Sequence, residues 1–347
     1  MKKNTTSRRQ FLNLGVQSLG AAAFGFSTAC KPKTPEIVVP EGPLFQISLA
    51  EWSLHKALKS GELDHLNFPK YTKDNFGITA LEHVNQFFSE KKDKWGLQPK
   101  NRVYLLDLKK RTDDLGMDNV LIMCDGVGKL GDSNTARRKN AVEGHYAWVE
   151  AAKLIGCHSI RVNAASDHKL SPEEQASLCA DGLRSLCDFA KQHGIGVIVE
   201  NHGGLSSDGA WLASVISKTG RNNAGTLPDF GNFYIVKNRG SNKKYEEAKK
   251  LYAQDAAYHE NEGGLEYDRY LGIKDLMPFA KGVSAKSHDF DDQGEEIHTD
   301  FHKAMKIVKD SGYRGYVGIE YEGDKLSEPD GIKATQALLK KTFAELG

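Results

Sequence analysis

Residues 196–202 read Gly196-Val197-Ile198-Val199-Glu200-Asn201-His202, a short apolar run that ends on a carboxylate. Such a run, bounded by glycine and polar residues, is typical of a strand that is buried on both faces. Similar runs recur along the chain, and we expect eight strands at 45–49, 78–82, 119–123, 159–163, 196–200, 224–229, 282–286 and 316–320. Helical patterns separate them. This alternation predicts an α/β fold, a (β/α)8 TIM barrel in a single domain, although an open doubly wound sheet shows the same alternation.

The clearest helix is expected over 171–194. Ser171 is a typical N-cap, Pro172 occupies the first helical position, leucines follow at helical spacing, and Gly194 ends the run. The same reasoning predicts helices over 134–154 and 330–346.

The connection over 238–276 is longer than the others, charged and rich in tyrosine, with a helical piece expected over 245–259. Insertions in barrels lie in loops, and a loop that follows a strand overhangs the active face. We therefore expect this connection to form a lid or a wall of the substrate site. The alternative is an ordinary surface loop.

The beginning of the chain resembles an export signal. Residues 7–12 read Ser-Arg-Arg-Gln-Phe-Leu, the pattern of a twin-arginine signal, and the weakly apolar stretch after them is too short for a permanent membrane helix. Small residues precede Cys30, as at a lipoprotein cleavage site. We expect a twin-arginine signal peptide over 1–30, a Pro-rich tether over 31–43 and the barrel over 44–347. The protein would then be exported by the twin-arginine machinery and be periplasmic, or held at the periplasmic face by lipidated Cys30.

Composition narrows the partners. The chain has 47 basic and 46 acidic residues, so it lacks the basic excess of a nucleic-acid-binding protein, and we expect no nucleic acid as a partner. The sequence does not indicate an oligomeric state. Four further cysteines show no metal-binding spacing and are expected to be small core residues: Cys124, Cys157, Cys179 and Cys187.

Three of the expected strands end on carboxylates, namely Glu200, Asp229 and Glu320. The ends of barrel strands meet at one mouth, where three uncompensated carboxylates would repel one another. A carboxylate at a strand end can also cap the next helix, but three in succession favour a divalent cation. His202 and His288 lie close to two of these strand ends, and oxygen ligands with one imidazole suit Mn²⁺, Mg²⁺, Co²⁺ or Zn²⁺.

Several motifs together resemble the xylose isomerase-like TIM barrel superfamily, the sugar phosphate isomerase/epimerase group. The resemblance extends from Phe45 to the C-terminus, and its motifs lie at 78–85, 197–204, 229–232, 284–289 and 318–323.

The resemblance implies one divalent metal ion held by Glu200, Asp229, His288 and Glu320. The third of these departs from the family pattern, His-x-Lys-Asp, in which the ligand stands two residues before the lysine. Ser284 occupies that place here. His202 or water is therefore the alternative to His288.

The resemblance also implies a sugar isomerase or epimerase in which Glu200 and Glu320 handle the proton, and Lys286 is a third catalytic candidate. A lyase or dehydratase of a keto-sugar or keto-glycoside is the main alternative. A non-catalytic sugar-binding barrel and a phosphodiesterase are further alternatives, the last disfavoured by the few histidines. We expect a non-phosphorylated sugar, because an exported enzyme rarely meets sugar phosphates and no phosphate cradle is visible.

Four residues near strand ends are candidates for substrate contact, each with an ordinary structural alternative. His202 and Asn163 follow or end strands, Trp52 is a candidate stacking platform or a core residue, and Glu82 belongs to the second-strand motif.

Overall fold

The computed structural model describes residues 44–91, 95–237 and 243–347. The predicted signal peptide, the tether and Cys30 lie outside these residues. Among the helices that are described, none is both long and apolar enough to cross a membrane.

Eight parallel strands form one curled sheet in the order β12-β13-β1-β2-β5-β6-β7-β8. Their bounds are β1 (Gln46–Ala50), β2 (Ala80–Val84), β5 (Asp118–Met123), β6 (Ser159–Asn163), β7 (Gly196–Glu200), β8 (Ala224–Leu227), β12 (Val283–Ser287) and β13 (Tyr316–Tyr321). Each overlaps one of the eight expected strands.

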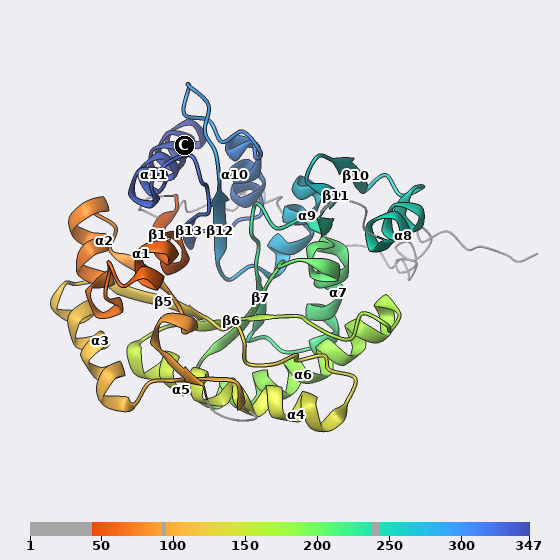
Figure 1. Ribbon diagram of the computed structural model, residues 1–347, viewed down its shortest axis with the longest axis horizontal. Helices are drawn as coiled ribbons and strands as arrows, with labels where there is room; N and C mark the ends of the chain where they lie inside the picture. Colours follow the sequence, from red (N-terminus) through yellow and green to blue (C-terminus); the bar gives the residue numbers. More distant parts are fainter. Residues whose placement is uncertain (1–43, 92–94, 238–242) are drawn as a thin grey trace, which may run out of the picture. The chain divides into compact units, whose positions relative to one another are not determined.

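The two ends of this strand order also meet. Parallel bridges join Thr226 to Ala280 and Asp229 to Ser284. The backbone N–H of Ser284 donates to the carbonyl of Pro228 at 2.9 Å. The sheet thus closes into a barrel with helices on its outside (Figure 1), which confirms the predicted fold class and excludes the open sheet.

The helices that follow the strands are α1 (His55–Ser60), α2 (Phe68–Phe76), α3 (Arg102–Asp114), α4 (Thr135–Gly144), α5 (Tyr146–Ile155), α6 (Pro172–Gln192), α7 (Gly209–Thr219), α10 (Phe301–Asp310) and α11 (Glu328–Leu346). Helix α6 begins as predicted. The Ser171 hydroxyl accepts from the backbone N–H of Glu174, whose carboxylate accepts from the N–H of Ser171 in return.

The expected single helix over 134–154 is wrong, because α4 and α5 are separate helices that meet at His145. The His145 ring contacts the carbonyl oxygen of Ala141 through Nδ1 at 2.7 Å. Gly144, the last residue of α4, packs against a segment that is distant in sequence. A Cβ added to Gly144 would stand 2.9 Å from the carbonyl oxygen of Trp95. This contact is made by a distant segment, so helical periodicity alone could not indicate the break.

The insertion contains a small sheet. Its elements are α8 (Lys243–Tyr252), β10 (Tyr258–Asn261), β11 (Gly264–Tyr267) and α9 (Arg269–Leu276). The sheet is completed by β9 (Tyr234–Lys237), which precedes residue 238, and the strand order is β10-β11-β9. The helix expected over 245–259 therefore ends early. Gly264, at φ 144°, provides a turn conformation that favours glycine, and it allows β10 to fold back on β11 as an antiparallel pair.

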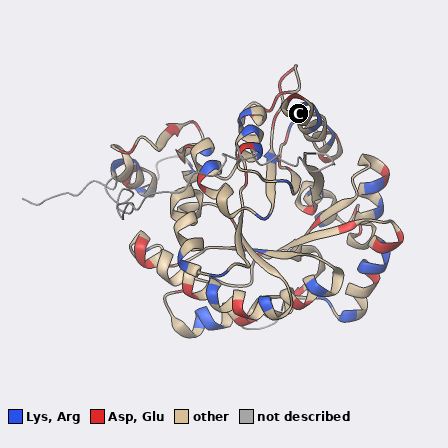
Figure 2. Ribbon diagram, turned by 180° about the vertical axis from the view of Figure 1, so that it is seen from behind, with Lys and Arg blue, Asp and Glu red and all other residues tan. Residues whose placement is uncertain are grey.

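Shorter elements connect the rest: η2 (Glu51–Leu54), η3 (His65–Asn67), η4 (Asn85–Phe88), β3 (Ser89–Lys91), β4 (Leu97–Pro99), η6 (Gly204–Ser207) and η7 (Met277–Phe279). The four expected core cysteines are buried and free, as predicted. The outer helices carry residues of both charge signs side by side (Figure 2), in keeping with the nearly balanced composition.

Candidate metal centre

Three buried carboxylates meet at the carboxyl ends of the barrel strands. Glu200 is the last residue of β7, Asp229 lies two residues after β8, and Glu320 lies in β13. Their exposed fractions are 0%, 0% and 4%. Each offers an oxygen, and these oxygens all lie within 4.8 Å of one another. The structure thus brings together three of the four predicted metal ligands.

The strand β12 adds a hydroxyl group to this cluster. Ser284 pairs with Asp229 across the barrel closure, and its Oγ lies 2.7 Å from Asp229 Oδ2 and 2.9 Å from Glu320 Oε2. A hydroxyl has one proton to donate, so it cannot donate fully to both carboxylates at once. The cluster therefore has acceptors left over, which a proton or a metal ion can satisfy.

Two buried cations face the carboxylates. The Lys286 ammonium lies 3.3 Å from Glu320 Oε1 and 3.7 Å from Asp229 Oδ2. Arg161, in β6, places Nε 2.8 Å from Glu200 Oε2. Sequence reasoning left Arg161 out of the site. The available signal was its polar character inside an otherwise apolar strand.

Burial dominates the electrostatics of this cluster. Desolvation raises the pKa of Glu200 to about 7 although Arg161 opposes the shift, and it raises the pKa of Asp229 to about 7 although Lys286 opposes it. Desolvation would lower the pKa of Lys286, but Asp229 and Glu320 raise it above its usual value, so the lysine keeps its proton. Three carboxylates face two cations, and the remaining negative charge with its oxygen donors fits a divalent ion.

The predicted fourth ligand lies apart from the three carboxylates. His288 follows the end of β12 at Ser287, and its Nε2 lies 4.0 Å from Glu322 Oε2 with 37% of the side chain exposed. It is not among the residues whose ligand atoms gather within 4.8 Å, as far as the described chain goes. The assignment of His288 as a ligand stays a prediction that requires its ring to turn inward.

Glu82 also lies inside the barrel. It is 1% exposed and accepts a 2.6 Å hydrogen bond from the hydroxyl of Ser48. Burial raises its pKa to about 8, against the effect of that hydrogen bond. Gly318 makes the room for it, because an added Cβ there would stand 2.4 Å from Glu82 Oε1.

A cavity of about 510 Å³ contains two of the predicted substrate residues, Asn163 and His202. Leu251 and Tyr252 of the insertion line the same cavity, so the insertion forms one of its walls. Asn232 was missed by the sequence analysis. Its Nδ2 donates to Glu200 Oε1 at 3.0 Å.

Trp52 lies elsewhere, partly buried, with its ring stacked on that of His55 at 4.8 Å between centroids. Burial alone would raise the pKa of Glu322, but Lys286, His288 and a hydrogen bond from Trp52 lower it. Because Glu322 Oε1 also lies 3.6 Å from the Lys286 ammonium, Trp52 is linked to the cluster through this carboxylate.

Comparison with solved structures shows similarity of fold at low sequence identity. A D-tagatose 3-epimerase-like protein superposes with a TM-score of 0.58 at 17% identity, covering 87% of this chain and 97% of that one. The apo form of a 3-keto-D-glucoside 4-epimerase from E. coli gives 0.57 at 16% identity, with 86% and 100% covered. An IolI protein with a bound zinc atom gives 0.57 at 13%, with 86% and 98% covered.

A comparison with curated protein sequences gives no match. The sequence profile of the xylose isomerase-like TIM barrel family, by contrast, matches residues 74–342, well over half of the chain. Together with the closed barrel, this match establishes that the chain belongs to the xylose isomerase-like TIM barrel family.

Proposed function

We propose that this protein is a metal-dependent isomerase or epimerase that moves a proton at a carbon next to the carbonyl of a non-phosphorylated sugar or keto-sugar. The observation that carries the proposal is the convergence of Glu200, Asp229 and Glu320 within 4.8 Å in a buried site. A divalent ion held there would polarise a sugar carbonyl and acidify the adjacent C–H.

Glu200 and Glu320 are the groups to which we assign proton transfer. They lie on β7 and β13, with β8 and β12 between them around the barrel, so they approach the cluster from different strands. Arg161 at 2.8 Å and Asn232 at 3.0 Å orient Glu200, and Lys286 at 3.3 Å orients Glu320. Epimerisation needs one group that takes a proton and another that returns one on the opposite face, and two separately held carboxylates suit this task.

We propose that the substrate enters through the cavity of about 510 Å³ that Asn163 and His202 line, and that its reacting carbon extends beyond this cavity to the mouth carboxylates, which do not line it. A cavity of this size accommodates a sugar, and its wall from the insertion would exclude water from one side. Trp52 and Glu82 remain candidates for contacts outside that cavity.

Structures of similar fold support a sugar as the substrate, although one of them, with a TM-score of 0.60 at 15% identity, is described as a sugar phosphate isomerase/epimerase. They include proteins described as a D-tagatose 3-epimerase-like protein, a 3-keto-D-glucoside 4-epimerase and an L-ribulose 3-epimerase, whose names specify sugars or a glycoside without phosphate. At 14–17% identity the likeness concerns the fold, so the choice of sugar depends on loops that differ between these chains.

The alternative is a lyase or dehydratase of a keto-sugar or keto-glycoside, and one observation favours it. In this reaction a carboxylate takes the proton from the carbon next to the carbonyl, and the bond to a β-oxygen then breaks. The carboxylate that takes this proton can return it to the leaving oxygen, and the Lys286 ammonium, 3.3 Å from Glu320, is a buried hydrogen-bond donor that would stabilise the departing oxygen. An isomerase and a lyase would therefore share the first step and differ in the fate of the intermediate.

We also propose that the protein is exported by the twin-arginine machinery and is either free in the periplasm or anchored at the periplasmic face through lipidated Cys30. The support is the Ser-Arg-Arg-Gln-Phe-Leu motif at 7–12 and the small residues before Cys30. An exported enzyme meets free sugars and glycosides rather than sugar phosphates, which agrees with the substrate class.

The reaction is tested by incubating the metal-loaded protein in D₂O with ketoses, keto-glycosides and sugar phosphates. We expect one solvent deuterium at the carbon next to the carbonyl of a non-phosphorylated product. Glu200→Gln and Glu320→Gln should each lower turnover at least about a hundredfold, the scale of lost general-base catalysis. Glu173→Gln, in an exposed pair with Lys218, is the control and should change little.

Each outcome of this assay has a meaning. Release of water or an alcohol would support the lyase, and sugar binding without turnover would support a non-catalytic barrel. If both Gln variants turn over substrate at near-native rates with metal bound, neither glutamate is the base, and Lys286 or His202 becomes the candidate.

The fourth ligand is tested separately by metal content. We expect His288→Ala to lower occupancy of the mouth site sharply and Ser284→Ala to lower it little. Loss of metal in His202→Ala with retention in His288→Ala would instead assign His202.

A further inference from the structure

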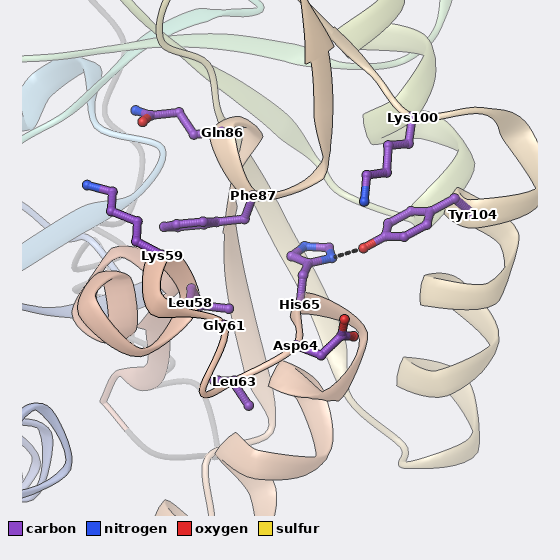
Figure 3. A pocket seen from close by; sticks show the side chains of 10 residues that line it. All are labelled: Leu58, Lys59, Gly61, Leu63, Asp64, His65, Gln86, Phe87, Lys100 and Tyr104. Atoms are coloured by element: carbon purple, nitrogen blue, oxygen red, sulfur yellow. Dashed lines mark hydrogen bonds between the residues drawn. The ribbon is translucent and has the colours of Figure 1, made fainter.

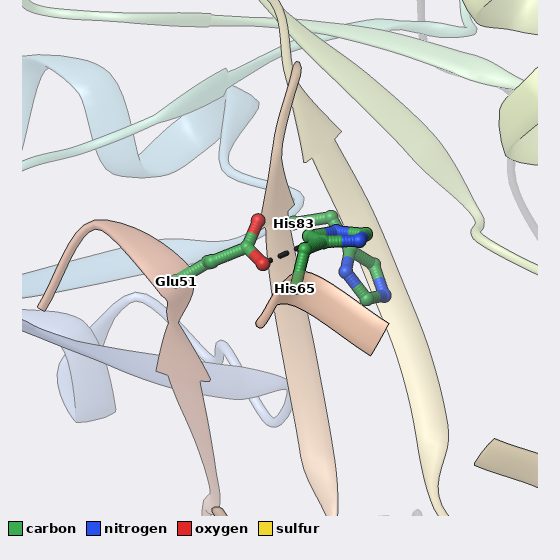
Figure 4. Close-up of side chains that lie close together, drawn as sticks. All are labelled: Glu51, His65 and His83. Atoms are coloured by element: carbon green, nitrogen blue, oxygen red, sulfur yellow. Dashed lines mark ion pairs between the residues drawn. The ribbon is translucent and has the colours of Figure 1, made fainter. Parts of the chain in front are cut away.

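A second group of potential metal ligands lies away from the mouth carboxylates. Glu51 is in η2 directly after β1, His65 is in η3, and His83 is in β2. Their exposed fractions are 0%, 6% and 0%. Each offers one ligand atom, and the three atoms lie within 4.8 Å of one another (Figure 4).

This group is outside the barrel, whereas the mouth site is inside it. Successive side chains of a strand point to opposite faces, and Glu82 points to the interior, so His83 points to the surrounding layer. Its ring packs edge-on against Phe68 of α2 and Phe88 of η4. A ligand bound here would therefore not be part of the mouth site.

The atoms that face one another lack hydrogen-bond partners. Within the described chain, Glu51 Oε1, His65 Nε2 and His83 Nδ1 are buried and make no hydrogen bond. Glu51 Oε1 and His65 Nε2 lie 3.2 Å apart without the alignment of a hydrogen bond. Buried polar atoms are rarely left unsatisfied, so three such atoms at one place point to a missing group.

The other polar atoms of the same side chains are held in place. Glu51 Oε2 accepts from the backbone N–H of Val84 at 2.7 Å, and His65 Nδ1 lies 2.8 Å from the hydroxyl of Tyr104. His83 Nε2 lies 2.7 Å from Asn119 Oδ1. Metal-binding histidines characteristically use their second nitrogen in this way, which fixes the direction of the ring.

The contacts of Asn119 also fix the tautomer of His83. The Nδ2 of Asn119 donates to Thr112 Oγ1 at 2.9 Å and to the carbonyl of Ile155 at 2.8 Å. Its Oδ1 is therefore an acceptor, and His83 Nε2 must carry the proton. This leaves a lone pair on His83 Nδ1, the form in which an imidazole binds a metal.

A cavity borders one member of this group, His65. It has a volume of about 400 Å³ and is lined by His65 and Tyr104 together with Asp64, Phe87 and Lys100, among others. Figure 3 shows the His65 ring and the Tyr104 hydroxyl facing each other at its wall.

We propose that Glu51, His65 and His83 bind a second divalent transition-metal ion, of which Zn²⁺ is the best fit. Two imidazoles and one carboxylate are a donor set that zinc uses with a fourth position left open. The ion would connect the turn after β1, the η3 turn and β2, three segments that are separate in the sequence. Its role here is to stabilise this side of the barrel, and it does not depend on the reaction at the mouth.

The first experiment counts Zn²⁺ ions bound to the full chain after chelator treatment, with a chromophoric competitor. The wild-type chain should bind one equivalent of Zn²⁺ more than His65→Gln. The affinity of this site for Zn²⁺ should fall by more than about a hundredfold in His65→Gln, which exceeds the usual loss when a residue beyond the direct ligands is changed. Tyr104→Phe should weaken the same equivalent by about 10–100-fold. His145→Gln is the matched control, a buried histidine outside the group, and should not change the count.

The second experiment separates the two sites. In Asp229→Asn/Glu320→Gln, which removes mouth ligands, one Zn²⁺ equivalent should remain and should still raise the thermal midpoint. In crystals, anomalous scattering at the zinc edge should place an ion about 2.0–2.2 Å from the three donor atoms.

Equal counts in wild type and His65→Gln, with both variants folded by circular dichroism, would overturn the proposal. An empty group in zinc-soaked crystals would overturn it as well. If the double variant does not fold, the comparison of wild type with His65→Gln decides alone.

Discussion

Lys286 is the group whose removal should reveal most about the mouth site. Its side chain is 3% exposed, and its ammonium lies 3.3 Å from Glu320, 3.6 Å from Glu322 and 3.7 Å from Asp229. Lys286→Met keeps a long unbranched side chain but leaves these carboxylates without that cation. Removing one partner of a buried ion pair typically costs about 3–5 kcal/mol. We expect the free energy of unfolding of the metal-free protein to fall by an amount in that range at pH 8.

The loss should depend on pH and on metal. At pH 6 it should be smaller, because Asp229, with a pKa of about 7, can take up a proton in place of the lost cation. Saturating Mn²⁺ or Zn²⁺ should restore much of the stability, since a dication can occupy the space that the ammonium leaves. A ligand at a hundred times its Kd stabilises a protein by about 2.7 kcal/mol.

The assay is urea unfolding followed by circular dichroism, in EDTA and in excess metal. Lys56→Met is the control, because Lys56 pairs with Asp324 at 2.8 Å on the surface, where such pairs contribute about 0–1 kcal/mol. The reasoning is refuted if Lys286→Met is no less stable than the control in EDTA. It is also refuted if metal stabilises the variant no more than the wild type.

Three further predictions concern other parts of the molecule. Glu200 and Asp229 hold protons in the folded state that the unfolded chain releases near pH 4, so their contribution to the stability of the metal-free protein should fall as pH rises from about 4 to about 7. The measurement is the difference in unfolding free energy between wild type and Glu200→Gln/Asp229→Asn in chelator across about pH 4–8, and a difference that does not change with pH would contradict the prediction. Metal should remove the trend. Gly318→Ala should destabilise the fold by about 1–3 kcal/mol in urea titrations, since its Cβ would stand 2.4 Å from Glu82 Oε1, whereas an unchanged midpoint would mean that Glu82 moves freely. Mass spectrometry of the exported protein should find its first residue at or shortly after Cys30, and an intact leader on a cytoplasmic protein would remove the export argument.

The local pattern of the sequence was sufficient to predict the barrel. Apolar runs of strand length alternate with capped helices, and each of the eight expected strands overlaps an observed one. It was also sufficient to predict that Glu200, Asp229 and Glu320 meet, because the carboxyl ends of parallel barrel strands all lie at one mouth. Both results need only the order of elements and the positions where strands end.

The direction of individual side chains required the folded chain. His288 was expected to be a metal ligand near the end of its strand, but β12 ends at Ser287, so strand alternation no longer controls the direction of its ring. Arg161 was not assigned to the site, although the register of β6 beside β7 aims it at Glu200. Such contacts depend on strand register and on barrel closure, which the local pattern does not contain.

The group formed by Glu51, His65 and His83 shows this limit most clearly. The three residues belong to three elements and share no motif, so no spacing in the sequence relates them. They meet because β1 pairs with β2 and because η3 packs over the outer face of that pair. The sequence by itself thus determined the order of the elements, the family and the carboxylates at the mouth. Only the tertiary structure decided which buried atoms are left facing one another without a partner, because that depends on the packing of segments far apart in the chain.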